Sequence, residues 1–319
     1  MLHAERLVDA PIIYSELDPS IGDNIQGPSL IRVPDWVSNP LGRYYLYFAD
    51  HKGSYIRLAY ANELKGPWRI HTPGSLQLAA SGFPTTPPRY TTEQADAARA
   101  RAANIRLPHD VLHEMTVPHI ASPDVHVDHE RREIIMYFHG LESFGRQVTR
   151  LATSADGIVY NALPEILGRT YMRVFRHLDM TYALAMPGIL YRSRTGRSDF
   201  EAGPTLFTSD MRHAALLKRD DTLYVYWTRV GDAPERILRS TIALGADWMK
   251  WQDEDEQEVL RPENDWEGAS APNLPSMRSV AYGRVNQLRD PAIFEEAGET
   301  YLLYAVAGES GIAIARLSD

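Results

Sequence analysis

Cysteine is absent from this chain of 319 residues. The absence excludes disulfide bonds, thiolate metal sites and cysteine nucleophiles, and it is typical of a protein from a reducing compartment. Positive charge is scarce as well, because 33 Lys and Arg residues stand against 42 Asp and Glu, for a formal net charge of -9. Nucleic acids and anionic membranes are usually bound by basic surfaces, so we expect neither as a partner.

Long apolar runs and targeting signals are also missing. The opening MLHAERLVDAPII has neither the positively charged segment nor the apolar run of a secretory signal, and no stretch reaches the length of a membrane helix. We expect a cytoplasmic protein; the alternative is a secreted protein whose signal has been removed. The sequence also lacks a glycine-rich phosphate loop, a nucleophile elbow and a dinucleotide fingerprint, and so it gives no support for a kinase, an esterase or a dehydrogenase.

The sequence does contain a repeated unit of short strands. Residues 27–64 and 289–317 have the same order of parts: an apolar run with a proline, a polar turn, an aromatic run, a loop and a third alternating run. Three further copies occupy residues 122–157, 171–196 and 213–242. Runs of β-branched and aromatic residues between Asp, Gly and Pro turns are typical of strands and hairpins.

Five such units predict an all-β, five-bladed β-propeller in a single domain over residues 1–319. A small antiparallel sheet cannot bury both of its faces alone, so repeated sheets pack radially against one another. A two-sheet β-sandwich is the alternative, but it does not explain five similar units. We expect residues 7–14 to add the outer strand that the fifth copy lacks. The other outer strands are predicted at residues 67–73, 162–168, 203–209 and 247–253.

Residues 75–119 interrupt the pattern between blades 1 and 2. Within them, TTEQADAARARAAN predicts a helix, because Thr91 and Gln94 match a capping box and the alanine-rich run has a high helix propensity. A connection from an outer strand to the next inner strand crosses the mouth of the central channel. We therefore expect this insert to act as a lid or to form the contact of a homodimer.

The copies differ where their strands face the channel. Aligned on their prolines or equivalents, the inner strands bring five residues to one level: Gly27, Ser122, Tyr171, His213 and Asp290. Two residues further along, on the same face of each strand, are Ser29, Asp124, Arg173, Ala215 and Ala292. Loops that open on the same face add His51, Lys52, His139, Glu142, Glu235, Arg236 and Glu309. Repetition builds the scaffold, and the divergent polar residues at the axis indicate an acid–base site.

Two short motifs at the heads of inner strands indicate a family. Asp290-Pro291-Ala292-Ile293 and Ser122-Pro123-Asp124-Val125 resemble the five-bladed propellers of glycoside hydrolase family 43 and the related family 117, which acts on α-linked anhydrogalactose. The resemblance covers nearly the whole chain. It implies hydrolysis of a glycosidic bond by a general base and a general acid, with a further carboxylate tuning the acid. Inversion then requires the two catalytic groups roughly 6.5–9.5 Å apart.

The chain departs from the family 43 pattern at three positions. Gly27 stands where the resemblance implies the base, and Tyr171 stands at the carboxylate position of the third blade. The acid of the fourth blade is replaced by Met211, Arg212 and His213. In family 117 a histidine acts as the acid, so the resemblance to that family implies that His213 is the acid here.

The candidate residues divide into two groups. The predicted catalytic residues are Asp124, Asp290, His213 and Glu235. The predicted substrate-binding residues are Arg173, Arg236, Arg289, His139, His51 and Glu309. The three arginines could bind an anionic sugar such as a uronate or sulfate by bidentate hydrogen bonds, or they could pair with neighbouring acids. For Asp290 the alternative is a capping role in its own turn.

Our first hypothesis is a glycoside hydrolase-like enzyme that acts on a small oligosaccharide or glycoside. A non-catalytic carbohydrate-binding propeller and a lyase or transferase on the same scaffold stay open, because a fold does not determine its chemistry. No cofactor is required, although an oxygen-rich channel could hold Ca²⁺ or Mg²⁺. In the insert, His109, His113 and His119 could form a metal site, but we favour a structural role.

Overall fold

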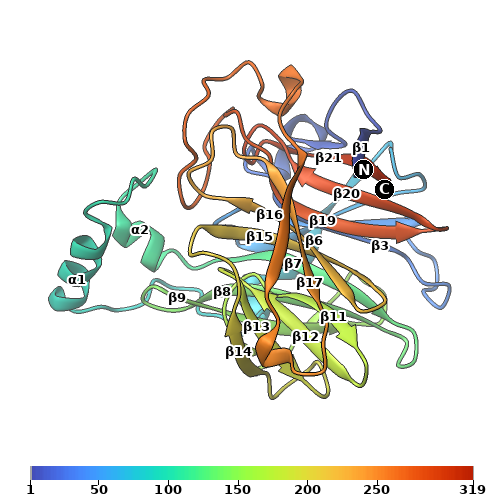
Figure 1. The fold of residues 1–319 in the computed structure, drawn as a ribbon, viewed down its shortest axis with the longest axis horizontal. Helices are drawn as coiled ribbons and strands as arrows, with labels where there is room; N and C mark the ends of the chain where they lie inside the picture. The colour runs from blue at the N-terminus through green and yellow to red at the C-terminus, as the bar shows by residue number, and fades with distance from the viewer. Residues whose placement is uncertain (1, 319) are drawn as a thin grey trace.

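The computed structural model describes residues 2–318, and its strands form five separate antiparallel sheets. Consecutive strands make up each sheet, and inner strands of different sheets contact one another around a central channel. In Figure 1 the chain runs through the sheets in sequence order, and its two ends meet in the same sheet. This arrangement confirms the predicted five-bladed β-propeller and excludes the β-sandwich.

The blades are numbered along the chain. Blade 1 consists of β3 (Gln26–Arg32), β4 (Tyr44–Ala49), β5 (Tyr55–Ala61) and β6 (Arg69–Gln77). Blade 2 consists of β7 (Ile120–Asp128), β8 (Glu133–Ser143), β9 (Arg146–Ser154) and β10 (Asn161–Ala162). Blade 3 consists of β11 (Arg173–His177), β12 (Met180–Ala185), β13 (Ile189–Ser193) and β14 (Glu201–Thr205). Blade 4 consists of β15 (Met211–Arg219), β16 (Thr222–Arg229), β17 (Ile237–Ala243) and β18 (Asp253–Leu260). Blade 5 combines β19 (Arg289–Glu296), β20 (Glu299–Ala305) and β21 (Gly311–Ser318) with β1 (His3–Arg6) and β2 (Ile13–Tyr14).

The N-terminal segment closes the ring as predicted, and its two strands coincide only in part with the predicted residues. We expected the outer strand within residues 7–14, whereas β1 pairs with one end of β21 and β2 pairs with the other. Between β1 and β2 the chain bends near Pro11, which has no N–H to donate to a neighbouring strand. Blade 5 therefore unites both ends of the described chain.

The outer strand of blade 4 was predicted in the wrong place. Residues 247–253 form a 3₁₀ turn, Trp248–Lys250, which Asp247 caps through its side chain. Trp248 and Trp251 are buried against blade 3, where both contact the ring of Tyr182. The true outer strand is β18, an acidic and largely exposed segment, because an edge strand needs no apolar residues and is protected by charge.

Each inner strand has a residue in the left-handed conformation at its channel end. The five residues and their φ angles are Gly27 (64°), Ser122 (50°), Tyr171 (60°), His213 (49°) and Asp290 (48°). In four blades this residue coincides with a shift in the pairing between the first two strands, as a β-bulge produces. The structure thus gives the five aligned positions one backbone geometry.

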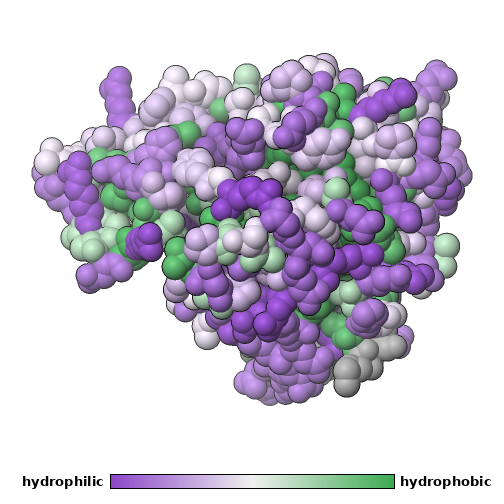
Figure 2. All heavy atoms as spheres, turned by 90° about the horizontal axis from the view of Figure 1, so that it is seen from above, coloured by the Kyte–Doolittle hydropathy of each residue, from purple (hydrophilic) through white to green (hydrophobic). Residues whose placement is uncertain are grey.

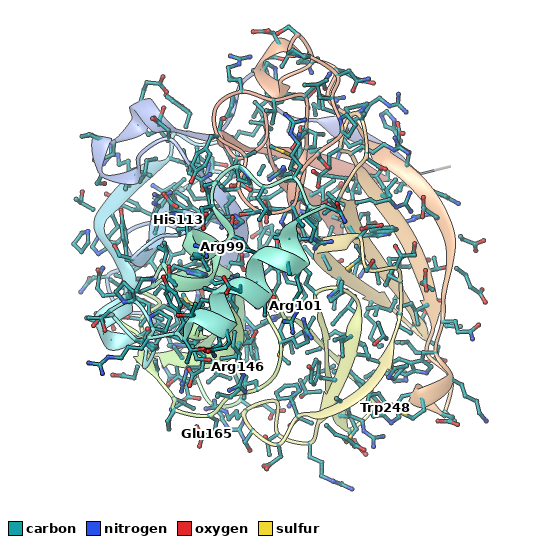
Figure 3. The ribbon with its side chains drawn as sticks, turned by 90° about the vertical axis from the view of Figure 1, so that its left-hand side faces the viewer. Arg99, Arg101, His113, Arg146, Glu165 and Trp248 are labelled. Atoms are coloured by element: carbon teal, nitrogen blue, oxygen red, sulfur yellow. The ribbon has the colours of Figure 1, made fainter. Side chains whose placement is uncertain are left out.

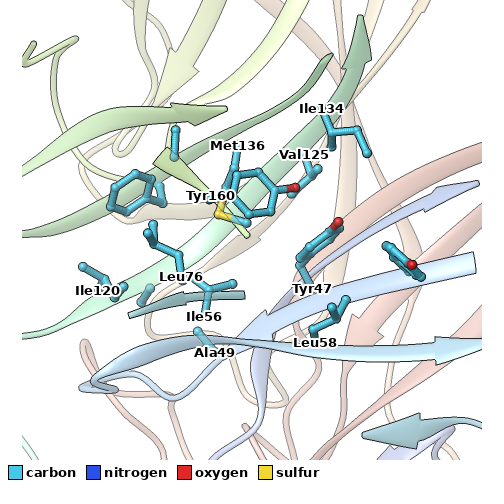
Figure 4. Packing of buried hydrophobic residues seen from close by; sticks show 14 of the residues in the cluster. Tyr47, Ala49, Ile56, Leu58, Leu76, Ile120, Val125, Ile134, Met136 and Tyr160 are labelled. Atoms are coloured by element: carbon cyan, nitrogen blue, oxygen red, sulfur yellow. The ribbon is translucent and has the colours of Figure 1, made fainter. Parts of the chain in front are cut away.

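Apolar side chains of neighbouring blades pack against one another. Figure 4 shows such packing between blades 1 and 2, with Tyr47, Ile56 and Leu58 on one side and Met136 and Ile134 on the other. The aromatic second strands therefore supply the core between blades, as the sequence predicts. Because each blade buries both faces in this way, the axis is free to carry polar residues.

The insert forms two helices, α1 (Thr92–Ala102) and α2 (Val111–Thr116). The capping box is present: Thr91 accepts a hydrogen bond from the Gln94 backbone N–H, and the Gln94 side chain accepts one from Thr91. In Figure 1 both helices project to one side of the sheets. A homodimer contact through this insert stays a prediction.

The face of the molecule seen in Figure 2 is mainly hydrophilic. Figure 2 shows one face on which polar and charged side chains surround smaller hydrophobic areas. No helix within residues 2–318 has the length and hydropathy needed to cross a bilayer. A cytoplasmic location stays a prediction.

Candidate active site

A cavity of about 310 Å³ lies between the insert and the channel mouth. Its floor includes residues of four inner strands or the turns before them: Gln26, Ser122, Tyr171 and His213. Its roof is built by α1, α2 and the segment between them. Figure 3 looks at this side of the molecule, where α1 with Arg99 and Arg101 lies in front of the ring of blades. The insert therefore covers the cavity at the channel mouth, and its action as a lid stays a prediction.

Asp290 lies directly beneath this floor and has the most unusual environment of the axial acids. Its side chain is fully buried, its Oδ1 accepts a hydrogen bond from Tyr171 Oη at 2.7 Å, and its Oδ2 has no hydrogen-bond partner among residues 2–318. Burial and the negative charge of Glu309 raise the pKa of Asp290 to about 6. Asp290 can therefore hold or release a proton near neutral pH.

His213 is the neighbour of this carboxyl group on blade 4. Its Nε2 lies 3.8 Å from Asp290 Oδ1, and its ring lies 5.3 Å from that of Tyr171 between centroids. Burial and the positive charges of Arg212 and Arg289 lower the pKa of His213 well below its ordinary value. His213 is thus neutral near pH 7, and it is better suited to accept a proton than to donate one.

Two more neutral histidines border the cavity. Burial and the Lys52 charge lower the pKa of His119 to about 3, and burial together with His119 lowers that of His139 well below its ordinary value. The His139 ring is buried, and its Nδ1 has no hydrogen-bond partner within the described chain. His139 therefore has an unpaired polar atom at the predicted substrate site, whereas the partly exposed His51 ring at the rim has its Nδ1 3.6 Å from Glu309 Oε1.

Glu235 is held in a buried ion-pair network. Both oxygens of Glu235 accept from the Arg212 guanidinium, the Nε contact being 2.9 Å, and Arg289 Nε lies 3.3 Å from the same carboxylate. Burial would raise the pKa of Glu235, but the two arginines outweigh it and lower this pKa. The structure therefore brings Glu235 close to the axis but leaves it a fully paired carboxylate.

Glu309 completes this network. Arg289 Nη1 donates to Glu309 Oε1 at 2.8 Å, and the Asn24 side chain donates to the other oxygen at 2.7 Å. His51 and Arg289 overcome the effect of burial and lower the pKa of Glu309 to about 2. Glu309 and Arg289 stabilise each other, and the charge of Glu309 acts on Asp290.

Asp124 and Arg173 lie one level deeper in the channel, beside a separate cavity of about 110 Å³. Asp124 pairs with His126 at 2.8 Å and accepts from the Val174 backbone N–H at 2.9 Å. The Arg173 guanidinium spans the channel, donates to the carbonyl oxygens of Pro123 and Ala214, and lies 4.4 Å from the Tyr171 ring centroid. Asp124 is consequently separated from the cluster of Asp290 and His213.

This position of Arg173 bears on the predicted channel metal. A guanidinium already takes the carbonyl oxygens that a Ca²⁺ or Mg²⁺ ion would use, so the channel residues do not fit a cation there. Residues 2–318 contain no group of three or more His, Asp or Glu side chains that could hold a metal ion. The rings of His109 and His113 meet edge to face with 4.3 Å between centroids, and His109 Nε2 lies 2.6 Å from a Glu114 oxygen, which agrees with a structural role.

The arginines predicted to bind an anionic sugar have internal partners. Arg236 lies outside the cavity lining, where its guanidinium pairs with Glu258 at 3.1 Å and Asp232 at 3.7 Å. Arg173 and Arg289 are buried and hydrogen-bonded as described. The geometry thus favours the alternative in which these arginines balance neighbouring acids.

Comparison with known proteins identifies one clear sequence relative, although no family model matches the chain. An uncharacterized protein of Acanthamoeba polyphaga mimivirus is 38% identical over 320 residues, which cover 92% of this chain and 83% of the relative. The chain belongs to the same family as this viral protein.

Solved structures of glycoside hydrolase family 43 have the same fold as this protein. A β-xylosidase/α-arabinofuranosidase from a compost microbial metagenome, in complex with xylotriose, has a TM-score of 0.58 and 11% identity over 99% of this chain and 95% of its own. A family 43 enzyme of Xanthomonas citri has a TM-score of 0.56 and 11% identity over 97% and 89%. The predicted resemblance to family 43 propellers is confirmed for the fold. The resemblance to family 117 stays a prediction.

Sequence reasoning missed Glu114 as a site residue. This carboxylate of α2 lines the cavity from the lid, where it pairs with Lys52 at 3.2 Å and accepts from the Ser279 hydroxyl. Burial would raise the pKa of Glu114, but Lys52 and Ser279 lower it, so Glu114 is ionised. Tyr171 was read only as a lost carboxylate, although it is the group that joins Asp290 to the cavity.

Proposed function

We propose that the protein is a glycosidase that cleaves a small glycoside in the cavity between the lid and the channel mouth. The observation that carries this proposal is Asp290, a buried carboxyl group with a pKa of about 6 that is hydrogen-bonded to a cavity-lining tyrosine. General acids in glycosidases are carboxyl groups whose pKa is raised by an apolar environment.

Asp290 acts as the acid through Tyr171. When Asp290 is protonated, it donates to Tyr171 Oη across the 2.7 Å contact, the reverse of the hydrogen bond that the ionised carboxylate accepts. The Tyr171 hydroxyl then donates its proton to the glycosidic oxygen while the Asp290 proton moves to Tyr171 Oη. The leaving group departs as an alcohol, Tyr171 stays neutral and Asp290 becomes ionised. Because Asp290 itself does not line the cavity, the tyrosine is the only part of this pair that contacts the ligand.

Glu114 acts as the base. It is the carboxylate that lines the cavity from the roof, and its lowered pKa keeps it ready to accept a proton from water. An acid on the floor and a base on the roof approach the ligand from different sides, as inversion requires. The opposite pKa shifts of Asp290 and Glu114 support this division of roles.

The structural neighbours suggest which glycosides to test. Their names include a β-xylosidase/α-arabinofuranosidase, an exo-1,5-α-L-arabinanase and an exo-β-1,3-galactanase. We therefore propose xylosides, arabinofuranosides and galactosides as the first panel, together with uronic and anhydro sugars.

The test is hydrolysis of aryl glycosides by the wild type and by Asp290→Asn, Tyr171→Phe and Glu114→Gln. Loss of an acid or a base should lower kcat by about 10²–10⁴-fold. The matched control is Glu142→Gln, which alters a carboxylate that pairs with Arg150 outside the cavity and should leave kcat unchanged. Full activity in folded Asp290→Asn and Glu114→Gln would refute the acid and base roles.

A carbohydrate-binding propeller without catalysis is the second candidate. His213 and Asp290, two of the catalytic residues predicted from the sequence, favour this candidate. The distance of 3.8 Å between His213 Nε2 and Asp290 Oδ1 is too short to admit a substrate and a water between them. Sugar binding by calorimetry without turnover, unchanged by Glu114→Gln, would support this candidate.

A further inference from the structure

The roof and the floor of the cavity differ in chemistry. Most of the roof is apolar: its apolar side chains are Ala98, Ala102, Ile105, Leu107, Val111 and Met115, and its charged members are Arg101 and Glu114, all contributed by the insert. The floor carries hydrogen-bonding groups, including Gln26, Ser122, His139, Tyr171 and His213. The cavity is thus mainly apolar on the side of the insert and polar on the side of the channel.

The apolar roof is not part of the propeller core. None of its six side chains belongs to the five hydrophobic clusters formed by the described residues. Ile105 is 49% exposed although it lines the cavity, and Leu107, Val111 and Met115 are only half-buried. These side chains therefore present apolar surface to whatever occupies the cavity.

We propose that the ligand is a glycoside with an apolar aglycone, such as an aryl or alkyl group, rather than a free oligosaccharide. This inference rests on the proposed function for the position of the sugar. The glycosyl group lies on the polar floor near Tyr171 and His213, and the aglycone packs against the apolar roof.

Desolvation distinguishes the two classes of ligand. Sugar hydroxyl groups that replace water beneath the six apolar side chains, away from Arg101 and Glu114, would lose hydrogen bonds without gaining partners, which is unfavourable. An aryl or alkyl group in the same place removes apolar surface from water on both sides. The roof therefore selects against a second sugar and in favour of an apolar group.

The size of the cavity agrees with this choice. Its volume of about 310 Å³ is near the lower end of the roughly 300–1,000 Å³ found for small-molecule sites. Space of this size suits one sugar ring with a compact substituent. A longer oligosaccharide would have to leave the cavity past the lid.

The experiment measures binding separately from catalysis. Matched methyl and phenyl thioglycosides of xylose, arabinofuranose and galactose resist hydrolysis, and their Kd values for the wild type are measured by calorimetry beside xylotriose. We expect the phenyl thioglycoside of the preferred sugar to bind about tenfold more tightly than its methyl partner, with a more negative heat-capacity change.

A roof variant tests the position of the aglycone. Ile105→Asn should weaken phenyl thioglycoside binding several-fold and leave methyl thioglycoside binding unchanged. The matched control is Leu178→Asn, which alters another exposed hydrophobic residue, 84% exposed and outside the cavity lining. Thermal unfolding of both variants shows whether they are folded.

The outcomes separate this inference from the proposed function. A phenyl preference that Ile105→Asn removes supports the inference even if no glycoside is hydrolysed, in which case the proposed function fails alone. Equal binding of methyl and phenyl partners, or tighter binding of xylotriose, overturns the inference even if hydrolysis is observed. An equal loss for both partners in Ile105→Asn, or no binding of any probe, also overturns it.

Discussion

Replacing Asp290 with asparagine should change how the stability of the propeller depends on pH. Burial and the charge of Glu309 raise the pKa of Asp290 from 3.8 to about 6. When the pH rises from about 4 to 6, the unfolded chain loses this proton first, so the folded state of the wild type becomes relatively less stable. Asparagine binds no proton in this range, and its side-chain oxygen can still accept the hydrogen bond from Tyr171.

The magnitude follows from the same two pKa values. A difference of one pKa unit corresponds to about 1.4 kcal/mol, so the step from 3.8 to about 6 corresponds to about 3 kcal/mol. Stabilisation by the Asp290 proton is fully present below about pH 4 and is lost as the pH rises through 6. The free energy of unfolding of Asp290→Asn relative to the wild type should therefore rise by about 3 kcal/mol between about pH 4 and pH 8.

Urea unfolding followed by tryptophan fluorescence at several pH values measures this difference. Asp128→Asn is a control of opposite sign, because hydrogen bonds from Arg131 overcome the effect of burial and lower the pKa of Asp128. The wild type gains stability from this carboxylate as the pH rises towards about 4, so the stability of Asp128→Asn relative to the wild type should fall in that range and stay constant above it. A pH-independent difference between Asp290→Asn and the wild type would show that Asp290 is ionised in the usual range, and the acid role proposed for it would then lack its basis.

Two further predictions concern the axis. Gly27→Ala should lower the free energy of unfolding by about 1–2 kcal/mol, because the φ angle of Gly27 is 64° and an added Cβ would lie 3.1 Å from Ser122 Cα. Unfolding in urea measures this difference. An unchanged or higher stability of the variant would contradict the reasoning. Glu235→Gln should destabilise by about 3–5 kcal/mol, since it leaves the buried Arg212 without its carboxylate. The exposed pair of Arg219 should contribute less than about 1 kcal/mol by the same assay, and equal losses at both sites would argue against a structural role of Glu235.

The fold could be predicted because the repeat is visible in the apolar pattern. Each blade must bury aromatic and β-branched residues against its neighbours, so residues such as Tyr47 and Tyr226 recur at equivalent places. The helix of the insert was predictable for a local reason, the capping box of Thr91 and Gln94. Both signals lie in short stretches of sequence.

Outer strands and site contacts depend on packing between distant segments. The buried Trp248 made residues 247–253 resemble a strand, but its ring packs on blade 3 and the acidic β18 forms the edge. Likewise, the hydrogen bond between Tyr171 and Asp290 joins residues 119 positions apart. The sequence indicates which residues reach the axis, but pairings such as this one appear only when the ring closes.

The five left-handed residues connect the scaffold with the site. Four of them are not glycine, and each holds a backbone conformation that is unfavourable by about 1–2 kcal/mol for an ordinary residue. The left-handed residue lies at a bulge in blades 4 and 5 and just before β11 in blade 3, and it brings Tyr171, His213 and Asp290 into one cluster beneath the cavity. At Gly27 the same geometry carries no side chain, and the carboxyl group of the axis is supplied instead from blade 5. The axial position with this strained backbone is thus also the position at which the blades differ in chemistry, which is the pattern expected of a ring whose repeated backbone positions a single asymmetric site.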